Sequence, residues 1–296
     1  MIAIIIKTYC RDRQVKTCID SIFSFVDHPF RIYLADDSPK HEHPSSLYEK
    51  LIDEGHYVRF FDSKVSVTHA RNYLVEQLQD EPYVLRIDDD FIFSHETSLS
   101  AMVDVLRVSD VIGAVSSVER QLGDGKGVRD GELSDKQGFF VREGRALHKL
   151  CMPVNAVSWM TTDRGTSYSL FDFTRNCLLI KREVFEKVSW REELFIQGEH
   201  SAFMLDLKRA GYFLAQTPDS IHCHDERSAK EASYLDVRKS QEGLAAMQAF
   251  YAKEYGIDEI KTFSLGKVLE TQNPSYSRML RMFASRAAKD VRRLFK

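Results

Sequence analysis

Apolar, β-branched segments alternating with amphipathic segments are the feature that most constrains the fold of this chain. The run Ile-Ala-Ile-Ile-Ile at residues 2–6 indicates a strand buried on both faces, which is typical of a parallel sheet. Residues 13–26 follow with apolar side chains at helical spacing. Strands that alternate with helices of this length predict βαβ units and a doubly wound, mostly parallel α/β sheet. The expected strands are residues 2–6, 30–35, 57–61 and 83–87, and the expected helices between them are residues 13–26, 45–54 and 68–79.

The second part of the chain has a different pattern. Residues 117–169 are rich in glycine and charge, which predicts hairpins and loops over the sheet and a place for an acceptor. A strand at residues 177–180 and helices at residues 182–188, 199–210 and 233–254 are expected to follow. The organisation expected from this is a ligand-binding half at 1–115, a second half of the same domain at 116–230, and C-terminal helices at 231–296.

Composition narrows the class of protein. The chain has 296 residues, of which 43% are hydrophobic and 29% charged, as in an ordinary globular protein. Its net charge of −3 predicts no nucleic-acid partner. The five cysteines are irregularly spaced, which favours a reducing compartment and therefore a cytoplasmic protein. The sequence contains no run of eighteen apolar residues, so it predicts no membrane-spanning helix.

Two acidic clusters follow expected strands, at the edge where an open parallel sheet binds ligands. Asp36 and Asp37 follow one strand, and Asp88, Asp89 and Asp90 follow another. Adjacent carboxylates repel one another unless a cation neutralises them, so the second cluster predicts a Mg²⁺ or Mn²⁺ site that also takes substrate phosphates. With strand alternation, Asp88 and Asp90 are expected to point the same way and Asp89 the opposite way. The alternative is a solvated acidic turn.

The order of several short motifs resembles glycosyltransferase family 2 and its relatives with the GT-A fold. In the first half these motifs are Thr8-Tyr9, Asp36-Asp37-Ser38, Ala70-Arg71-Asn72 and Ile87-Asp88-Asp89-Asp90. The second half, with Asp172-Phe-Thr-Arg-Asn176, Trp190, Gly198-Glu199-His200 and Pro218-Asp-Ser-Ile-His222-Cys-His224, is similar to the β-1,4-N-acetylgalactosaminyltransferases. The resemblance implies a GT-A nucleotide-sugar-binding domain and an inverting, metal-dependent transfer to a glycan or lipid-linked acceptor. A UDP-sugar is the favoured donor.

The resemblance also implies roles for individual residues. Glu199 is expected to be the general base, and a base at a helix N-terminus would be kept ionised by the helix dipole. The donor would be held by Thr8, Tyr9, Asp36, Asp37, Arg71, Asp88 and Asp89. The acceptor would be bound by Asp172, Asn176, Trp190 and His200. The metal ion would be bound by Asp88, Asp90 and His224, with His222 as the competing histidine on the same strand face.

Departures from the family pattern keep other readings open. His200 and Ala202 stand where many family members have acids, so a non-catalytic sugar- or lipid-carrier-binding protein on the same scaffold is one alternative. An NDP-sugar nucleotidyltransferase is another, although the expected glycine-rich loop is missing from residues 8–12. The Gln-x-x-Arg-Trp signature of processive synthases is absent, which favours the addition of single sugars.

The C-terminal segment at residues 275–296 has a separate signal, with seven Lys or Arg against one acid. At helical spacing its apolar side chains lie on one face and most basic ones on the other, which predicts reversible binding to an anionic membrane surface. The expected location is the cytoplasm, with peripheral attachment to the cytoplasmic face of the inner membrane. The alternative is a helix docked on the domain. The apolar face consists of Leu280, Phe283, Ala287, Val291 and Leu294, and the basic face consists of Arg278, Arg281, Lys289, Arg292, Arg293 and Lys296.

Overall fold

The computed structural model describes residues 1–39, 45–123, 130–134, 136–225 and 241–264. Its central sheet has the strand order β3-β2-β1-β4-β11-β6-β12-β10-β9, and β5 pairs with β12 beside this path. The strands β3, β2, β1 and β4 are parallel, as the βαβ pattern predicted. They span Ile2–Thr8 (β1), Phe30–Asp36 (β2), Tyr57–Phe60 (β3) and Tyr83–Asp88 (β4).

The other half of the sheet is mixed rather than mostly parallel. Strand β11 runs antiparallel to both of its neighbours, β4 and β6, while β12 is parallel to β6. Two parallel neighbouring strands need a crossover connection, which is usually a helix. Between β6 and β11 the only helix in the described chain is a three-residue 3₁₀ helix, η2 (Val154–Ala156), which agrees with their antiparallel pairing. The strands of this half are Phe91–Ile92 (β5), Ile112–Leu122 (β6), Met160–Thr161 (β9), Ser167–Phe171 (β10), Leu178–Lys181 (β11) and Phe213–Asp225 (β12).

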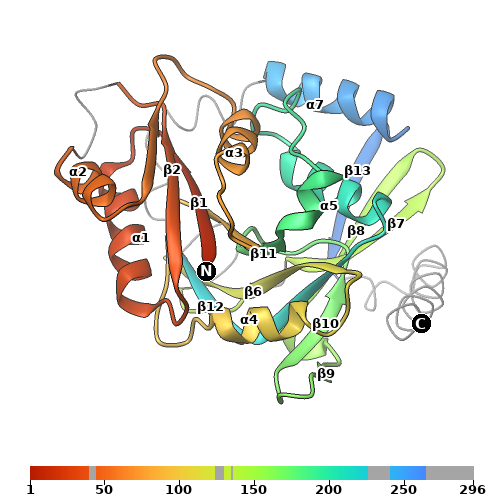
Figure 1. Cartoon of the computed structure of the whole chain (residues 1–296). Helices are drawn as coiled ribbons and strands as arrows, with labels where there is room; N and C mark the ends of the chain where they lie inside the picture. The colour runs from red at the N-terminus through yellow and green to blue at the C-terminus, as the bar shows by residue number, and fades with distance from the viewer. Residues whose placement is uncertain (40–44, 124–129, 135, 226–240, 265–296) are drawn as a thin grey trace.

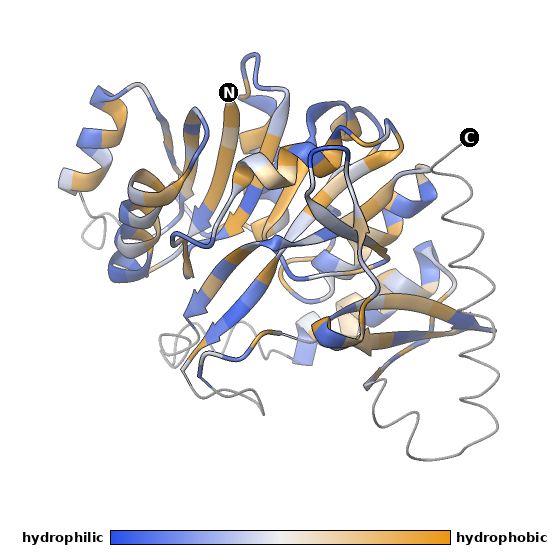
Figure 2. Cartoon of the chain, turned by 90° about the horizontal axis from the view of Figure 1, so that it is seen from below, coloured by the Kyte–Doolittle hydropathy of each residue, from blue (hydrophilic) through white to orange (hydrophobic). Residues whose placement is uncertain are grey.

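Helices cover both faces of the sheet (Figure 1). On one face a core cluster joins Ile2, Ile4 and Ile6 to residues of α1, α2 and α4, and on the other face a second cluster joins Ala3 and Ile5 to residues of α3, α5 and α7. This period of two explains why the run at residues 2–6 is apolar throughout. In Figure 2 the central strands are largely hydrophobic, while the helices show both colours. The helices are Asp12–Phe25 (α1), Ser45–Asp53 (α2), Val67–Glu76 (α3), Leu99–Leu106 (α4), Glu199–Arg209 (α5) and Gln241–Glu254 (α7).

A second, smaller sheet has the order β13-β8-β7, from Gln137–Glu143 (β7), Ala146–Met152 (β8) and Glu259–Ser264 (β13). The hairpin of β7 and β8 fits the expectation for residues 117–169, but β6 extends the main sheet to Leu122. Strand β13 lies where only C-terminal helices were expected, because its backbone pairs in parallel with β8. The helix expected at residues 182–188 is a 3₁₀ helix, η3 (Arg182–Glu186).

Two expectations concern the end of the chain and the membrane. The segment at residues 275–296 lies outside the described residues. Among the helices that the structure describes, none is both long enough and apolar enough to cross a membrane. The sequence analysis divided the domain into two halves at 115/116. The pairing of β4 with β11 joins strands from both halves in one continuous sheet.

Candidate functional site

A cavity of about 390 Å³ lies where β1 and β4 end, beneath the first turn of α5. Strand-end carboxylates form one wall, and Leu244 and Met247 of α7 contribute an apolar wall. Of the residues predicted for a site, the cavity is lined by Tyr9, Arg71, Asp88, Asp89, Asp90, Asn176, Glu199, His200 and His224. Parallel strands and helix termini thus converge on the edge of the sheet that the sequence indicated.

Gly198 sets the position of the α5 N-terminus. Its φ of 77° is in the left-handed region, and an added Cβ would lie 2.7 Å from the side chain of Met247. Tyr251 on α7 donates a hydrogen bond to the Gly198 carbonyl at 2.7 Å. A glycine is therefore required both by the backbone and by the close approach of α7. This contact fixes where Glu199 and His200 begin the helix.

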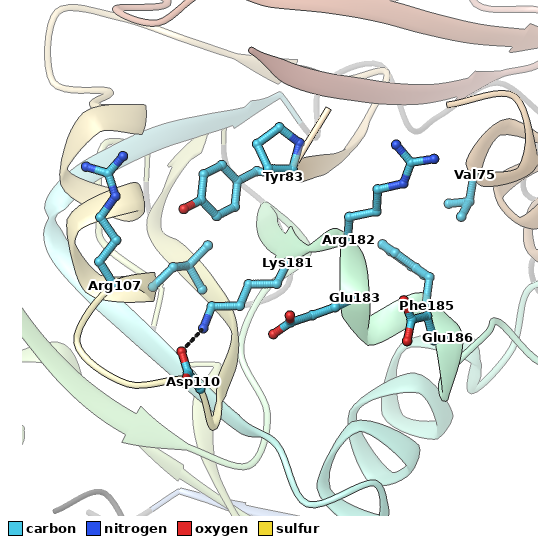
Figure 3. Close-up of a pocket in the computed structure, with 11 residues that line it drawn as sticks. Val75, Tyr83, Arg107, Asp110, Lys181, Arg182, Glu183, Phe185 and Glu186 are labelled. Atoms are coloured by element: carbon cyan, nitrogen blue, oxygen red, sulfur yellow. Dashed lines mark ion pairs between the residues drawn. The ribbon is translucent and has the colours of Figure 1, made fainter. Parts of the chain in front are cut away.

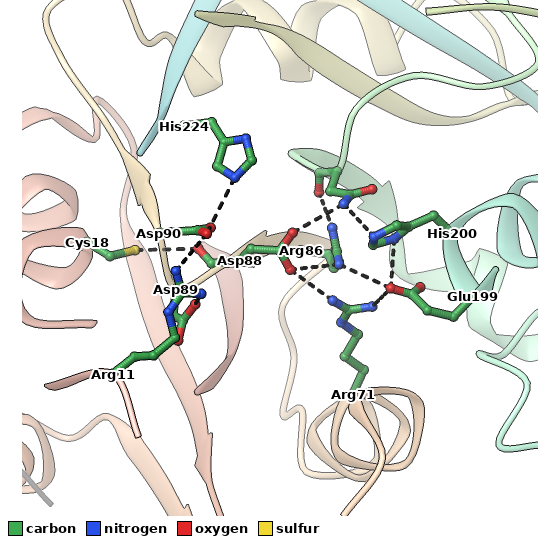
Figure 4. Close-up of polar contacts among 11 residues, drawn as sticks. Arg11, Cys18, Arg71, Arg86, Asp88, Asp89, Asp90, Glu199, His200 and His224 are labelled. Atoms are coloured by element: carbon green, nitrogen blue, oxygen red, sulfur yellow. Dashed lines mark hydrogen bonds and ion pairs between the residues drawn. The ribbon is translucent and has the colours of Figure 1, made fainter. Parts of the chain in front are cut away.

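Glu199 is a buried carboxylate held on one oxygen by two arginines and a histidine. Its Oε1 lies 2.9 Å from Arg71 Nη1 and 2.9 Å from His200 Nδ1, and Arg86 Nη2 lies 3.8 Å away (Figure 4). Burial raises the pKa of Glu199, but Arg71 and His200 outweigh this effect and lower it to about 2. Its Oε2 is buried and has no hydrogen-bond partner among the described residues. Glu199 is therefore ionised at neutral pH.

Asp88 belongs to the same network. Its Oδ1 accepts hydrogen bonds from Arg71 at 3.0 Å and from Arg86 at 2.9 Å, and its Oδ2 accepts one from Asn176 at 3.2 Å. These partners lie on the side of the sheet covered by α3 and α5. The Asp88 carboxylate is thus neutralised by two arginines.

Asp89 and Asp90 form a second cluster around Arg11, separate from Asp88 (Figure 4). Arg11 donates to Asp89 at 2.6 Å and to Asp90 at 2.9 Å, and Thr8 donates to Asp89 at 2.7 Å. The expectation that Asp88 and Asp90 point the same way is wrong. Strand β4 ends at Asp88, so residues 89–90 form a turn and strand alternation no longer applies.

The pairing of β5 with β12 brings His224 to Asp90. His224 lies opposite Phe91 in this pairing, and the Asp225 amide donates to the Asp90 carbonyl at 3.0 Å. His224 Nε2 lies 3.4 Å from Asp90 Oδ2, and its Nδ1 lies 3.3 Å from Glu119 Oε2. The competing histidine, His222, is fully buried and hydrogen-bonds to Ser117 at 2.7 Å. The structure thus places His224, rather than His222, beside the acidic cluster.

The electrostatics of this cluster follow from burial and charge pairing. Burial raises the pKa of Asp90, but His224 and Arg11 together hold it far below its usual range. Burial lowers the pKa of His224, but Asp90 and Glu119 raise it to about 10. Burial raises the pKa of Asp89 to about 6 against the opposing effect of Arg11. Without a bound metal, His224 is therefore protonated at neutral pH.

The predicted metal ligands are only partly assembled. Within the described residues, no group of three or more His, Cys, Asp and Glu side chains is placed to hold a metal ion. Asp88 is engaged with arginines, whereas Asp90 and His224 lie together, and Asp90 Oδ1 is buried with no hydrogen-bond partner in the described part of the chain. Mg²⁺ in nucleotide sites often takes one or two carboxylates and fills its other positions with phosphate oxygens and water. Asp90 and His224 fit such a site, provided that the metal displaces the proton on His224.

Three of the residues predicted to bind the donor, Thr8, Asp36 and Asp37, do not line the cavity. Tyr9 lines the cavity, with Lys64 at 4.2 Å and Lys7 at 5.3 Å from its ring centre. Asp37 accepts hydrogen bonds from Lys7 at 2.7 Å and from the Val65 amide at 2.9 Å. Asp37 thus fixes Lys7, which lines the cavity itself.

Asp36 and Thr8 are also buried and do not line the cavity. Asp36 accepts hydrogen bonds from the Ser38 amide at 2.8 Å and from the Tyr48 hydroxyl at 2.6 Å. The donor-binding roles of Thr8, Asp36 and Asp37 therefore stay predictions, and their observed contacts are with neighbouring protein groups.

Two predicted acceptor residues lie outside the cavity. Trp190 is 2% exposed and stacks on Phe203, with 4.7 Å between the ring centres. Asp172 is buried, accepts a hydrogen bond from the Phe140 amide at 2.8 Å and pairs with Lys208. Both side chains contribute to the packing that supports α5, and their acceptor-binding roles stay predictions.

Several residues that line the cavity or hold its lining side chains in place were missed by the sequence analysis. Arg86 carries a charge inside an otherwise apolar strand, which is a signal that such a residue has a buried partner. Glu119 was not predicted because it lies in the part of β6 that extends into residues 117–169, where hairpins and loops were expected. Arg11 and Arg175 had no local signal, since their partners lie far away in the sequence. Arg175 Nε lies 2.9 Å from Glu119 Oε1.

A larger hollow of about 690 Å³ lies at the opposite end of β4, beside Tyr83 and Lys181 (Figure 3). Its acids and bases alternate, and Lys181 Nζ lies 4.0 Å from Asp110. It lies at the amino end of β4 and has no cluster of carboxylates of the kind formed by Asp88, Asp89 and Asp90. The smaller cavity is therefore the candidate site.

Comparison with known proteins agrees with this geometry. The sequence profile described as Glycosyl transferase family 2 matches residues 3–189. Human beta-1,4 N-acetylgalactosaminyltransferase 1 is 34% identical over 115 residues, which cover 38% of this chain and 20% of the relative. Mouse beta-1,4 N-acetylgalactosaminyltransferase 2 is 30% identical over 115 residues, or 38% of this chain and 21% of the relative. The match thus spans about a fifth of the length of these curated relatives.

Solved structures share the fold at low sequence identity. S. aureus TarS 1-349 in complex with UDP-GlcNAc has a TM-score of 0.55 at 13% identity and covers 92% of this chain and 76% of that chain. GalNAc-T7 with UDP, GalNAc and Mn²⁺ has a TM-score of 0.58 at 17% identity and covers 85% of this chain and 50% of that chain. The mixed sheet with helices on both faces is the GT-A fold of these structures. Because the family profile covers well over half of the sequence, the chain belongs to glycosyl transferase family 2.

Proposed function

We propose that this protein is an inverting, non-processive glycosyltransferase that moves a sugar from a nucleotide-diphosphate sugar to a glycan or lipid-linked acceptor. One observation carries the proposal. The cavity joins the strand-end acids Asp89 and Asp90 on one wall to Glu199 and His200 on the other. Transfer needs both parts, because one must hold the leaving diphosphate and the other must take a proton from the acceptor.

The donor would bind along the wall formed by β1 and β4. Asp90 and His224 would hold Mn²⁺ or Mg²⁺, which would neutralise charge on the departing diphosphate. Arg11 and Arg71 lie on either side of this position and add positive charge to the wall. A UDP-sugar is the favoured donor, since two structures with this fold were solved with UDP-GlcNAc or with UDP, GalNAc and Mn²⁺.

The base would come from the pair Glu199 and His200, which open α5 within the cavity. In an inverting transfer the acceptor oxygen attacks the anomeric carbon from the side opposite the diphosphate. The wall with Asp89 and Asp90 would hold the diphosphate on one side of the anomeric carbon. The wall with Glu199 and His200 would hold the acceptor on the other side. Glu199 was predicted to be the base, and its contact with His200 makes the two side chains one unit.

The acceptor is proposed to lie at an anionic membrane surface on the cytoplasmic side. The support comes from the sequence alone, through the basic and apolar residues at 275–296.

Turnover of a donor panel tests the proposed function. The protein is incubated with Mn²⁺ and UDP-, GDP- and TDP-sugars, and release of the nucleoside diphosphate is measured with and without oligosaccharide acceptors. A glycosyltransferase releases UDP and inverts the anomeric configuration in the product. A nucleotidyltransferase would instead release pyrophosphate from a nucleoside triphosphate and a sugar phosphate. Binding of UDP without any turnover would identify a non-catalytic binding protein.

A further inference from the structure

The imidazole of His200 is held at both of its nitrogen atoms. Nδ1 lies 2.9 Å from Glu199 Oε1, and Nε2 lies 2.6 Å from Asn176 Nδ2 (Figure 4). The His200 side chain is 39% exposed and lines the cavity, whereas the Glu199 side chain is 3% exposed. Of the two side chains, His200 is thus the one that a substrate in the cavity can reach.

The contacts of Asn176 determine which nitrogen of the imidazole carries the proton. Asn176 Nδ2 also lies 3.2 Å from Asp88 Oδ2. An ionised carboxylate only accepts hydrogen bonds, so the Asn176 atom beside it must be the amide nitrogen, which only donates. His200 Nε2 therefore accepts the second hydrogen bond of this amide, and Nδ1–H donates to Glu199. This is the neutral tautomer with a basic Nε2.

Glu199 is poorly suited to take a proton itself. Arg71 and Arg86 lie 2.9 Å and 3.8 Å from its Oε1, and both stabilise the ionised form. A carboxylate stabilised in this way is a weak base. Its remaining oxygen, Oε2, is enclosed by protein. A carboxylate that holds Nδ1–H of a histidine can, however, orient the ring and stabilise its protonated form, as in catalytic triads.

We propose that His200 is the catalytic base of the transfer and that Glu199 is a positioning residue behind it. This inference rests on the proposed function. The acceptor hydroxyl gives its proton to His200 Nε2 while its oxygen forms a bond to the anomeric carbon. The bond from that carbon to the diphosphate oxygen breaks, and the diphosphate leaves with the electron pair. His200 then returns the proton to solvent.

Asn176 completes the arrangement. A hydroxyl that enters between Asn176 and His200 accepts a hydrogen bond from Nδ2 and donates one to Nε2. The hydroxyl takes the place of the direct contact between these two side chains. One lone pair of the hydroxyl oxygen accepts the hydrogen bond from Asn176. The other lone pair is then free to point into the cavity, where the anomeric carbon would lie.

The test separates a base from a structural histidine. His200→Gln keeps a polar side chain without a basic nitrogen, and His200→Ala opens space for added imidazole. The assay measures UDP release from whichever donor wild-type protein turns over fastest, and calorimetry measures the Kd for UDP. His95→Ala is the matched control, because His95 is exposed and does not line the cavity. Glu199→Ala is assayed with added formate.

We expect His200→Gln to lower kcat by about a hundredfold or more, the scale for a positioned base, with an unchanged Kd for UDP. Imidazole should restore at least about tenfold in kcat to His200→Ala, and the restored rate should rise with the basicity of substituted imidazoles. His95→Ala should keep wild-type kcat and gain nothing from imidazole. Formate should not restore Glu199→Ala.

Three results would overturn the inference alone. They are a His200→Gln variant within about threefold of wild-type kcat, a His200→Ala variant that imidazole does not restore, and a Glu199→Ala variant that formate does restore. Failure of the wild-type protein to turn over any donor is a different result. It would overturn the proposed function, and the base assignment with it.

Discussion

Arg11 Nη2 lies 2.9 Å from Oδ2 of Asp90, and the two side chains are only 5% and 8% exposed. The same guanidinium also pairs with Asp89. A cation from the start of α1 thus occupies the centre of the acidic cluster that follows β4. Arg11 thereby compensates the negative charge of two adjacent buried carboxylates.

Arg11→Gln should destabilise the fold, because it leaves two buried carboxylates without their cation. Removing one partner of a buried ion pair costs about 3–5 kcal/mol. The free energy of unfolding, measured in urea, is expected to fall by an amount in this range. Mn²⁺ should recover more stability in Arg11→Gln than in wild-type protein, because it can neutralise the same acids.

Arg13→Gln is the matched control for this measurement. Arg13 lies two residues further on, in the first turn of α1, and is exposed. Its substitution should change the free energy of unfolding by less than about 0.5 kcal/mol. An equally small change in Arg11→Gln would contradict the assigned role of the ion pair.

Asp90→Ala should remove the metal-dependent part of UDP binding. Asp90 is the carboxylate that lies beside His224, and one of its oxygens is buried without a hydrogen-bond partner among the residues that the structure describes. Calorimetry with UDP, with and without Mn²⁺, is expected to show equal Kd values for this variant. Asp62→Asn, an exposed acid, serves as the control and should keep the metal dependence of the wild-type protein. If Mn²⁺ still tightens UDP binding to Asp90→Ala, the proposed metal position is wrong.

The ionisation of Glu199 should make stability depend on pH in acid. Its pKa is lowered from 4.5 to about 2 in the folded protein, because Arg71 and His200 outweigh burial. The unfolded chain therefore binds the proton more tightly, so the stabilisation is complete above about pH 4.5 and is lost as pH falls toward 2. The contribution is on the order of 3 kcal/mol.

Glu199→Gln isolates this effect, because the glutamine does not titrate. The difference in free energy of unfolding between wild-type protein and Glu199→Gln should be constant from pH 7 to about 4.5 and should shrink at lower pH. The control Glu49→Gln, at an exposed position on α2, should show a small difference throughout. A Glu199→Gln difference that does not change with pH would show that the ion pairs of Glu199 do not shift its pKa.

The segment at residues 275–296 should bind anionic vesicles. Each Lys or Arg near an anionic surface contributes about 1 kcal/mol, and salt weakens the attraction. Co-sedimentation is therefore expected for full-length protein at low salt, with less at high salt and little on neutral vesicles. A variant ending at Pro274 should lose this binding, and so should one with the six residues of the basic face (Arg278, Arg281, Lys289, Arg292, Arg293 and Lys296) changed to glutamine. Equal sedimentation of all three proteins would refute membrane binding through this segment.

Local sequence patterns determined the parallel half of the fold. The runs at residues 2–6 and 83–87 are apolar at every or nearly every position because helices cover both faces of the sheet, and this is visible without any knowledge of distant contacts. The strand ends then located Asp88, Asp89 and Asp90 at a ligand-binding edge. The helix expected at residues 199–210 likewise begins at Glu199 in the structure.

Only the tertiary structure determined which side chains each of these acids contacts. Asp88 turns to Arg71 and Arg86, whereas Asp90 turns to Arg11 and His224, because β4 ends between them and no local pattern records that ending. The pairing of β5 with β12 places His224, and not His222, beside Asp90, although both histidines lie on the same face of one strand.

The contact between His200 and Asn176 was also beyond the sequence alone. These side chains are 24 residues apart and meet because Asn176 lies just before β11 and α5 packs on the face of the sheet formed in part by Leu178 and Ile180. Secondary structure follows from nearby residues, but the partners of a buried charge follow from the way in which distant elements fill the core. For that reason the position of the site was predictable from the sequence, and the division of roles within it was not.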